Sequence, residues 1–390
     1  MSNIALRING PATVTYKGAT FYSKEAITLV EENKTFDIVT DRFGTVEQRA
    51  DQKTVTLSFT PDGRYAGFFG TLFPYGSFVP GSLTTPLRSF LAAAVTAGTD
   101  TINIPLHLFV AGDAVRLFTF GTIPAGIVAG TRYFVGSVDA NNIRLFTTRA
   151  AALTLTGPLD ITTQGTGEHR IIAQEQLTVL SSDGSQYVFD VAAISQMPDI
   201  EASTNNTLFG AVTFECYRGA NVAATTANSL FTLTTGVAFT EPGLDPSLII
   251  TQPYLFTWGA SPWVALETVD GFKWSFPMST EDVLDDTNGI LAKRITNIGC
   301  TIKCQPIGVT AQNVMDKLLL QGAGAQRGGR LGGVDDFIMT GTGVTVTGKG
   351  VGLRSGPQSF GRSTDRIGEL EFFATRTFTS GVPNPMFLVA

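Results

Sequence analysis

The chain has 390 residues, with 33 acidic residues against 27 Lys and Arg, for a formal net charge of −6. This length predicts two to three domains, each able to bury its own core. No stretch approaches 18 consecutive apolar residues, which excludes a membrane-spanning helix. Charged residues make up only 15% of the chain, against roughly 25% in typical soluble proteins. We therefore expect neighbouring molecules to cover much of the exterior, although a large and well-buried monomer would have the same composition.

Residues 1–10 have neither a basic start nor a long apolar run, so we expect no secretion signal. Along the chain, alternation of apolar and polar residues predicts a mainly β protein. The expected strands are residues 53–60, 177–180, 186–191, 210–217, 296–304, 343–351 and 367–377. Only residues 309–321 have clear helical spacing, and residues 64–72 are expected to form a shorter helix. The three cysteines are expected to be small core residues in a reducing compartment.

Two distant stretches have the same pattern. Residues 56–63 and 301–308, offset by 245, are each an alternating strand that ends in Pro-x-Gly. Each follows an acidic, turn-rich segment, residues 41–52 and 279–292, which we expect to be a long loop. Such self-similarity indicates an internal repeat.

The offset changes along the chain. Residues 18–20 match residues 259–261 at an offset of 241, which predicts that the second long loop is four residues longer. Residues 210–218 match residues 368–376 at an offset of only 158. The difference between the offsets of 245 and 158 predicts an extra segment of 87 residues within the first repeat, which we assign to residues 85–171.

The resulting domain organisation has four parts. The first repeat comprises residues 1–84 with 172–218, and the second comprises residues 254–390. A linker of residues 219–253 joins them. The insert, residues 85–171, is expected to be a small all-β domain with a net charge of +1, which leaves −7 on the rest of the chain.

Several motifs resemble ligand-binding or catalytic sites but lack a residue that such a site requires. Residues 343–350 have the spacing of a phosphate-binding loop, but Gly350 replaces the required Ser or Thr and no helix follows. Residues 282–289 are acidic, but Lys293 stands where a calcium loop needs Glu. The only histidines are His107 and His169, and there is no nucleophile elbow. We therefore expect neither an enzyme nor a bound cofactor or metal.

The insert resembles the small, immunoglobulin-like β modules of phage structural proteins, through Gly-x-x-Tyr-Phe-Val at residues 130–135 and Asn-x-Ile-Arg-Leu at residues 141–145. With the repeat, the whole chain resembles the tail tube protein of a long-tailed bacteriophage. The resemblance implies two tandem tail-tube-like β-sandwich or barrel domains, each with a short flanking helix, plus the inserted β domain. It also implies homotrimers that form pseudo-hexameric rings, which stack into a channel for DNA.

The same resemblance implies the partners and the location. The tape measure protein and DNA would pass through the lumen, tail terminator and baseplate proteins would bind the ends, and the chain would enter no membrane. The protein would be assembled in the bacterial host cytoplasm and would reside in the virion tail. The insert is expected to face outward and to be dispensable for tube building, because tolerated insertions lie at exposed loop tips.

In that family the long loop docks onto the adjacent ring. We therefore expect the mixed charges of the two loops to make ring-to-ring contacts, although they could simply be solvated hairpin ends. These residues are Asp41, Arg42, Glu47, Arg49, Asp51, Glu281, Asp282, Asp285, Asp286, Lys293 and Arg294.

Two other interpretations remain. One is another phage tail or capsid structural protein, such as a distal-tail or baseplate ring, a tube terminator or a decoration protein. The other is a carbohydrate-binding or adhesin-like β protein, which would present clustered exposed aromatic side chains on the insert. The candidates for such a cluster are Phe109, Phe118, Phe120, Tyr133, Phe134 and Phe146.

Overall fold

The computed structural model describes residues 4–8, 10–62, 66–203, 208–219, 230–240, 254–259, 266–285, 289–307, 335–341, 344–355, 368–380 and 382–390. The chain is mainly β, as predicted, and its described part contains one short α-helix. Each of the seven expected strands overlaps an observed one. The helix expected at residues 309–321 lies outside the described residues, whereas residues 66–72 form a 3-10 helix, η1 (Ala66–Leu72).

The first repeat is a sandwich of two antiparallel sheets. One sheet has the order β1 (Ile4–Ile8), β4 (Ile27–Thr40), β5 (Gly44–Phe59), β17 (Val212–Tyr217) and β15 (Val191–Gln196). The other has the order β18 (Phe231–Thr234), β14 (Gln186–Phe189), β13 (Leu177–Ser181), β2 (Ala12–Tyr16) and β3 (Ala19–Tyr22). Tyr16 and Phe214 meet edge to face between the sheets, with ring centroids 4.9 Å apart.

The second repeat forms an eight-stranded sheet together with β16 (Ile200–Ala202) of the first repeat. Its order is β16, β20 (Glu267–Ser275), β23 (Thr301–Ile307), β26 (Leu370–Ala374), β25 (Val344–Ser355), β24 (Asp335–Gly341) and β19 (Leu255–Trp258), and β29 (Phe387–Val389) also pairs with β25. Its core is aromatic, and the rings of Trp258 and Phe372 pack edge to face with centroids 4.9 Å apart.

The two repeats share one hydrophobic core. Phe73, which follows η1, packs edge to face on Phe276 at 5.1 Å, and Phe276 in turn packs on Phe387 at 4.6 Å. All three cysteines are buried in this core, as expected. The repeats are therefore joined by packing as well as by the chain.

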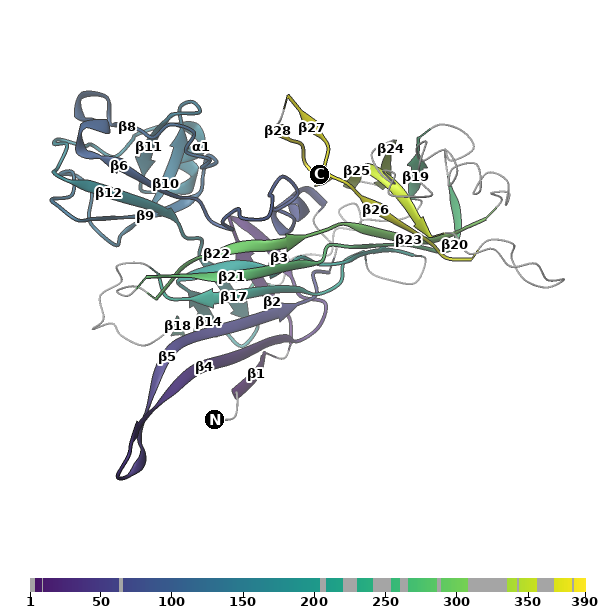
Figure 1. Cartoon of the computed structure of the whole chain (residues 1–390), viewed down its shortest axis with the longest axis horizontal. Coiled ribbons are helices and arrows are strands. Elements are labelled where there is room, and N and C mark those ends of the chain that lie inside the picture. Colours follow the sequence, from purple (N-terminus) through teal and green to yellow (C-terminus); the bar gives the residue numbers. More distant parts are fainter. Residues whose placement is uncertain are drawn as a thin grey trace.

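The insert, expected at residues 85–171, forms its own sheet beside the sandwich (Figure 1), and this sheet comprises strands within residues 87–173. Its order is β6 (Leu87–Leu91), β12 (Glu168–Ala173), β9 (Ala114–Thr119), β10 (Arg132–Ser137), β11 (Asn142–Phe146), β8 (Thr101–Asn103) and β7 (Val95–Thr96). Two short 3-10 turns, η2 (Ala92–Ala94) and η3 (Ala97–Thr99), and the helix α1 (Arg149–Thr154) complete it. A separate core that includes Val115, Val135 and Leu145 holds it together.

Two local features differ from the sequence prediction or were missed by it. The expected linker contains β18, whose pairing with β14 extends the sandwich. The sequence also gave no prediction of α1, which is capped by Thr148, whose hydroxyl accepts the Ala151 N–H at 3.2 Å. Near the chain end, β27 (Phe378–Thr379) and β28 (Val382–Pro383) form a small hairpin.

Candidate assembly surface

The two expected long loops are β-hairpins, so that prediction was wrong. The first arm, residues 34–52, consists of the paired ends of β4 and β5 around a turn at residues 41–43. The second arm, residues 278–298, consists of β21 (Met278–Asp285) and β22 (Gly289–Ile298). A hairpin satisfies its backbone groups by cross-strand hydrogen bonds. Side chains of the first arm are mostly exposed, and in the second arm four consecutive residues, 290–293, are buried, so neither arm has the apolar alternation that predicts a strand.

The two arms have the same register throughout, at an offset of 245 residues. In the first arm the pairing shifts after Lys34 and after Ile38, and in the second it shifts after the equivalent Ser279 and Val283. Such bulges are specific features of a strand pair rather than defects. The glycines that follow the two tips, Gly44 and Gly289, both have positive φ, 69° and 74°.

The arms are therefore equal in length, and the expectation of four extra residues in the second one was wrong. Ser23 bridges to Pro61, and Thr268 pairs with Pro306, which is the same offset of 245. The four-residue difference thus arises between Gly259 and Thr268, before the arm begins.

The sheets that carry the arms also correspond. The order β1-β4-β5-β17-β15 matches β16-β20-β23-β26-β25. Leu57 lies opposite Phe214, and Ile302 lies opposite Phe372, so both sequence offsets hold in the register. The edge position that β1 fills in the first sheet is filled in the second by β16, a strand from the first repeat. Main-chain hydrogen bonds therefore connect one repeat to the next.

A break in the strands redirects the second arm. β4 and β5 are continuous, whereas β20 and β21 are separated by Phe276 and Pro277, and β22 and β23 by Gly299 and Cys300. Pro277 has no N–H to give to a ladder. Its carbonyl accepts the Gly299 N–H at 2.9 Å, which closes the break. Beyond this point the second arm lies along the first repeat.

The second arm is buried against its own chain. Ile290 packs with Val191, Ala193 and Tyr217 on the outer face of β15 and β17. Leu291 and Ala292 pack instead with Phe118 and Ile172 of the insert, in a cluster completed at its margin by Leu83, Leu87 and Val283. The arm thus fills the space between the first repeat and the insert.

Polar contacts fix the same arm. The Lys293 ammonium lies 2.7 Å from Glu215 Oε2 and 2.7 Å from Asp282 Oδ1, and its side chain is only 6% exposed. The segment that leads into the insert pairs with β22: the Thr84 N–H donates to the Lys293 carbonyl at 2.7 Å, and the Ile295 N–H donates to the Ser82 carbonyl at 2.8 Å. The second arm is therefore fixed by backbone, ionic and apolar contacts together.

The described residues provide no such cover for the first arm. Val39 is 64% exposed, Phe43 70% and Val46 51%, whereas Leu291, the counterpart of Val46, is 4% exposed. Figure 1 shows this arm projecting from the body at the ends of β4 and β5. The two hairpins are therefore equal in length and register, but the first is exposed and the second is buried.

The charged residues predicted as a contact site divide accordingly. Asp41, Arg42 and Glu47 are exposed on the first arm, and Arg42 lies over the Phe43 ring at 5.2 Å. On the second arm, Glu281 and Arg294 form an exposed ion pair at 3.2 Å, whereas Asp282 and Lys293 are committed to contacts within the chain. The side chains of Arg49, Asp51 and Asp285, and all of Asp286, lie outside the described residues.

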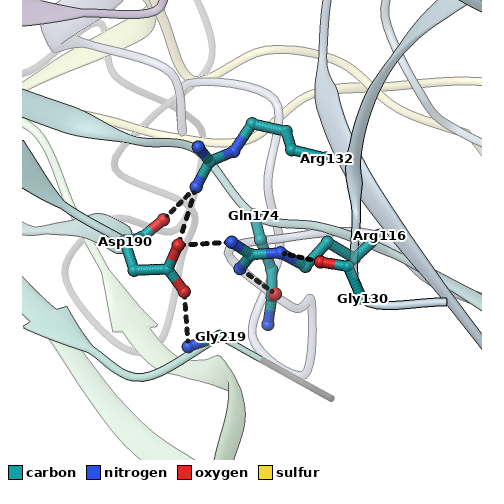
Figure 2. A network of polar contacts seen from close by, with 6 residues as sticks. All are labelled: Arg116, Gly130, Arg132, Gln174, Asp190 and Gly219. Atoms are coloured by element: carbon teal, nitrogen blue, oxygen red, sulfur yellow. Dashed lines mark hydrogen bonds and ion pairs between the residues drawn. The ribbon is translucent and has the colours of Figure 1, made fainter. Parts of the chain in front are cut away.

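Asp190, in the turn between β14 and β15, fixes the insert to the body (Figure 2). It accepts hydrogen bonds from Arg116, from Arg132 at 3.1 Å and from the Gly219 N–H at 3.0 Å. Arg116, only 5% exposed, also donates to the Gly130 carbonyl at 3.0 Å. The sequence gave no sign of this cluster, because its members come from four separate segments.

A second junction surrounds a cavity of about 160 Å³ between the insert and β2. Arg149 pairs with Glu175 at 2.6 Å, and Lys17 pairs with Asp113 at 3.1 Å. Burial opposes the charge on Lys17, but the nearby Asp113 and Glu175 carboxylates outweigh it, and the pKa of Lys17 is raised. The cations that line the cavity are therefore already paired.

The insert does not present the exposed aromatic cluster that an adhesin would need. Phe109, Phe118, Tyr133 and Phe146 are at most 5% exposed. Only Phe120 of the six candidates is largely exposed, and Arg170 lies over its ring at 4.7 Å.

The comparisons with known proteins give no family. No protein-family model matches the chain, and no curated protein matches it in sequence. Within the described ranges, no helix has the length and hydropathy needed to cross a membrane. The same part of the chain holds no group of three or more His, Cys, Asp and Glu side chains placed to bind a metal ion.

Proposed function

We propose that this chain is a structural subunit that polymerises into stacked trimeric rings with pseudo-hexameric symmetry, and that these rings form the tail tube of a long-tailed bacteriophage. The observation that carries the proposal is the pair of equivalent arms. One arm is buried on the neighbouring repeat of its own chain, and the other is exposed. The second arm makes its contact within the chain, and the first arm remains exposed to make the equivalent contact with another chain. A repeating assembly requires such an available contact.

The repeat supports closed symmetry. If the relationship between the repeats recurs between chains, three chains supply six similar positions around an axis. Closed rings of this kind are the usual outcome of head-to-tail contacts whose rotation closes. Pairing across units also removes free sheet edges, which would otherwise promote aggregation.

The charge distribution supports a channel for DNA. The chain outside the insert has a net charge of −7. A lumen without an excess of Lys and Arg would not hold the phosphate backbone by salt-dependent adhesion. In this proposal the tape measure protein and DNA occupy the lumen transiently, terminator and baseplate proteins bind the tube ends, and the protein resides in the virion tail.

Negative-stain microscopy of the purified protein, combined with light scattering over a range of concentrations, tests the proposal. We expect trimers that form rings with sixfold-like symmetry and then tubes of constant width. Single rings that never stack would favour a distal-tail, terminator or decoration protein. A monomer that stays monodisperse at high concentration would contradict assembly altogether.

A further inference from the structure

We infer that the exposed first arm docks on the outer face of β25 and β26 in another chain, and that this contact repeats between chains the contact the second arm makes within one. The inference rests on the proposed function, in that it assumes self-assembly. It adds a defined surface and a defined geometry, side by side between neighbouring repeats, rather than the ring-to-ring contact that the sequence suggested for these arms.

The register of the sheets identifies the target residues. Ala193 lies opposite Glu215 in the first repeat, and Gly352 lies opposite Phe373 in the second. Glu215 and Phe373 are thus counterparts, and two residues further along each strand Tyr217, which packs against the second arm, corresponds to Thr375. Because Phe372 is buried in the core and side chains alternate along a strand, Phe373 points to the opposite, outer face.

The ion pair of the contact within the chain has no charged counterpart at the proposed contact between chains. Within the chain, Lys293 of the second arm meets Glu215. In the first arm the position of Lys293 is taken by Gln48, and on the target face the position of Glu215 is taken by Phe373. Both members of this ion pair are thus replaced by uncharged residues, whereas Asp282, the second carboxylate beside Lys293, still has an aspartate, Asp37, as its counterpart.

Exposed apolar side chains lie on the first arm and on the hairpin β27–β28, which follows β26. The first arm exposes Val39, Phe43 and Val46, and Phe378 and Val382, which follow the target face in the chain, are 63% and 65% exposed. Exposed apolar groups of this kind mark interaction sites. A second chain of the same protein brings both surfaces to the contact without any other molecule.

The first arm cannot reach this face of its own chain. In Figure 1 the ends of β4 and β5 point away from the body at one end of the molecule, whereas β25 and β26 lie toward the opposite end. The contact is therefore between chains and joins unlike surfaces. A contact of this type closes into a ring or continues as a filament, depending on its rotation.

Disulfide trapping tests the geometry. Ile290 and Tyr217 are in contact within the chain, and their counterparts are Thr45 and Thr375. The native cysteines are all buried and should not interfere. We expect an equimolar mixture of T45C and T375C chains under mild oxidation to give a covalent dimer on a non-reducing gel, and the double variant to give a ladder that ends at the trimer, since three chains close the ring. Neither single variant alone should give the T45C–T375C dimer.

Matched substitutions on the two arms provide a second measurement. Val39 and Leu284 occupy the same position of their arms and are 64% and 62% exposed. Because Leu284 stays exposed in the docked second arm, docking should leave Val39 exposed too, whereas Val46 is the counterpart of the buried Leu291. We expect Val46→Ser to raise the concentration required for assembly about tenfold, and Val39→Ser to have no effect. Leu284→Ser should leave this concentration unchanged.

The outcomes separate this inference from the proposed function. Tubes that form normally without the T45C–T375C cross-link would overturn the docking geometry and leave the function standing. An equal loss of assembly in the Val46 and Val39 variants would also overturn it. A wild-type chain that never assembles would contradict both.

Discussion

The ammonium of Lys293 lies 2.7 Å from the carboxylate of Glu215 and joins the second arm to β17, a strand of the first repeat. Lys293 was expected at an exposed loop end, but it is among the least exposed charged residues of the described chain. Its second carboxylate, Asp282, comes from the facing strand of the same arm. This ion pair therefore holds the arm in its docked position.

Replacing Lys293 by alanine should destabilise the docked arm. The change leaves two partly buried carboxylates facing each other without their cation, which typically costs about 3 kcal/mol or more. The free energy of unfolding, measured in denaturant, should fall by about this amount. Gln48→Ala is the matched control, because Gln48 is the exposed counterpart in the first arm. Equal effects of the two substitutions would contradict the docked geometry.

Asp190 should control how firmly the insert is attached. In Asp190→Ala the buried Arg116 loses its carboxylate partner, and the attachment of the insert should weaken by about 2–4 kcal/mol. This is somewhat less than for a fully buried ion pair, because the Asp190 side chain is 29% exposed. Limited proteolysis should then release the insert near residues 85 and 174 faster than in the wild type. Glu168→Ala, which removes an exposed ion pair with Arg170, should have no measurable effect.

Gly219→Ala tests the same cluster without removing a charge. An added Cβ would lie 1.8 Å from Arg116 Nη1 and 2.3 Å from Asp190 Oδ2. The side chains must then move apart, so we expect the proteolysis pattern of Asp190→Ala. A wild-type pattern in both variants would show that the apolar contacts alone hold the insert.

His169 should make the insert less stable in acid. It is fully buried, with Nδ1 2.8 Å from the Thr119 hydroxyl and its ring 5.2 Å from that of Phe90. Burial lowers the pKa of His169 below the usual 6.5. Below about pH 6.5 the unfolded chain therefore binds a proton that the folded insert does not, and stability falls as the pH decreases.

Thermal unfolding between pH 7.5 and 5.5 measures this effect. The melting temperature of the wild type should fall more over this range than that of His169→Gln, which cannot titrate there. The quantity compared is the slope of the melting temperature against pH, so a loss of stability in the variant that is the same at every pH does not affect the result. Parallel slopes would show that His169 does not contribute.

The insert should be removable without loss of assembly. Leu87 and Ile172 pair at its two ends, and the Ala173 N–H donates to the Pro86 carbonyl at 2.9 Å, so a short Gly-Ser turn can replace residues 87–172. We expect tubes that are thinner and smoother. Stability should drop by about 2 kcal/mol, because the change uncovers Leu291. A folded variant that no longer assembles would place the insert within the ring contacts.

Much of the architecture could be predicted from the sequence. Alternation predicted the positions of the strands, since one buried face per strand leaves a period of two. The offsets of 245 and 158 residues, which equated positions of the two repeats, are kept in the pairing: Leu57 lies opposite Phe214 in the first sheet, just as Ile302 lies opposite Phe372 in the second. These residues are core residues, whose apolar character is required wherever the fold recurs.

Other features depend on contacts between distant segments. Neither arm has one buried face that alternates with an exposed one, so neither left an apolar pattern of period two, and the sequence alone suggested loops. Val46 and Leu291 occupy equivalent positions, yet only Leu291 is covered, because Pro277 and Gly299 turn the second arm onto the first repeat. Whether a charged side chain such as Lys293 faces solvent or a carboxylate is decided by that packing. The sequence by itself thus determined the repeated core, and only the tertiary structure decided which arm is buried and which is free to bind.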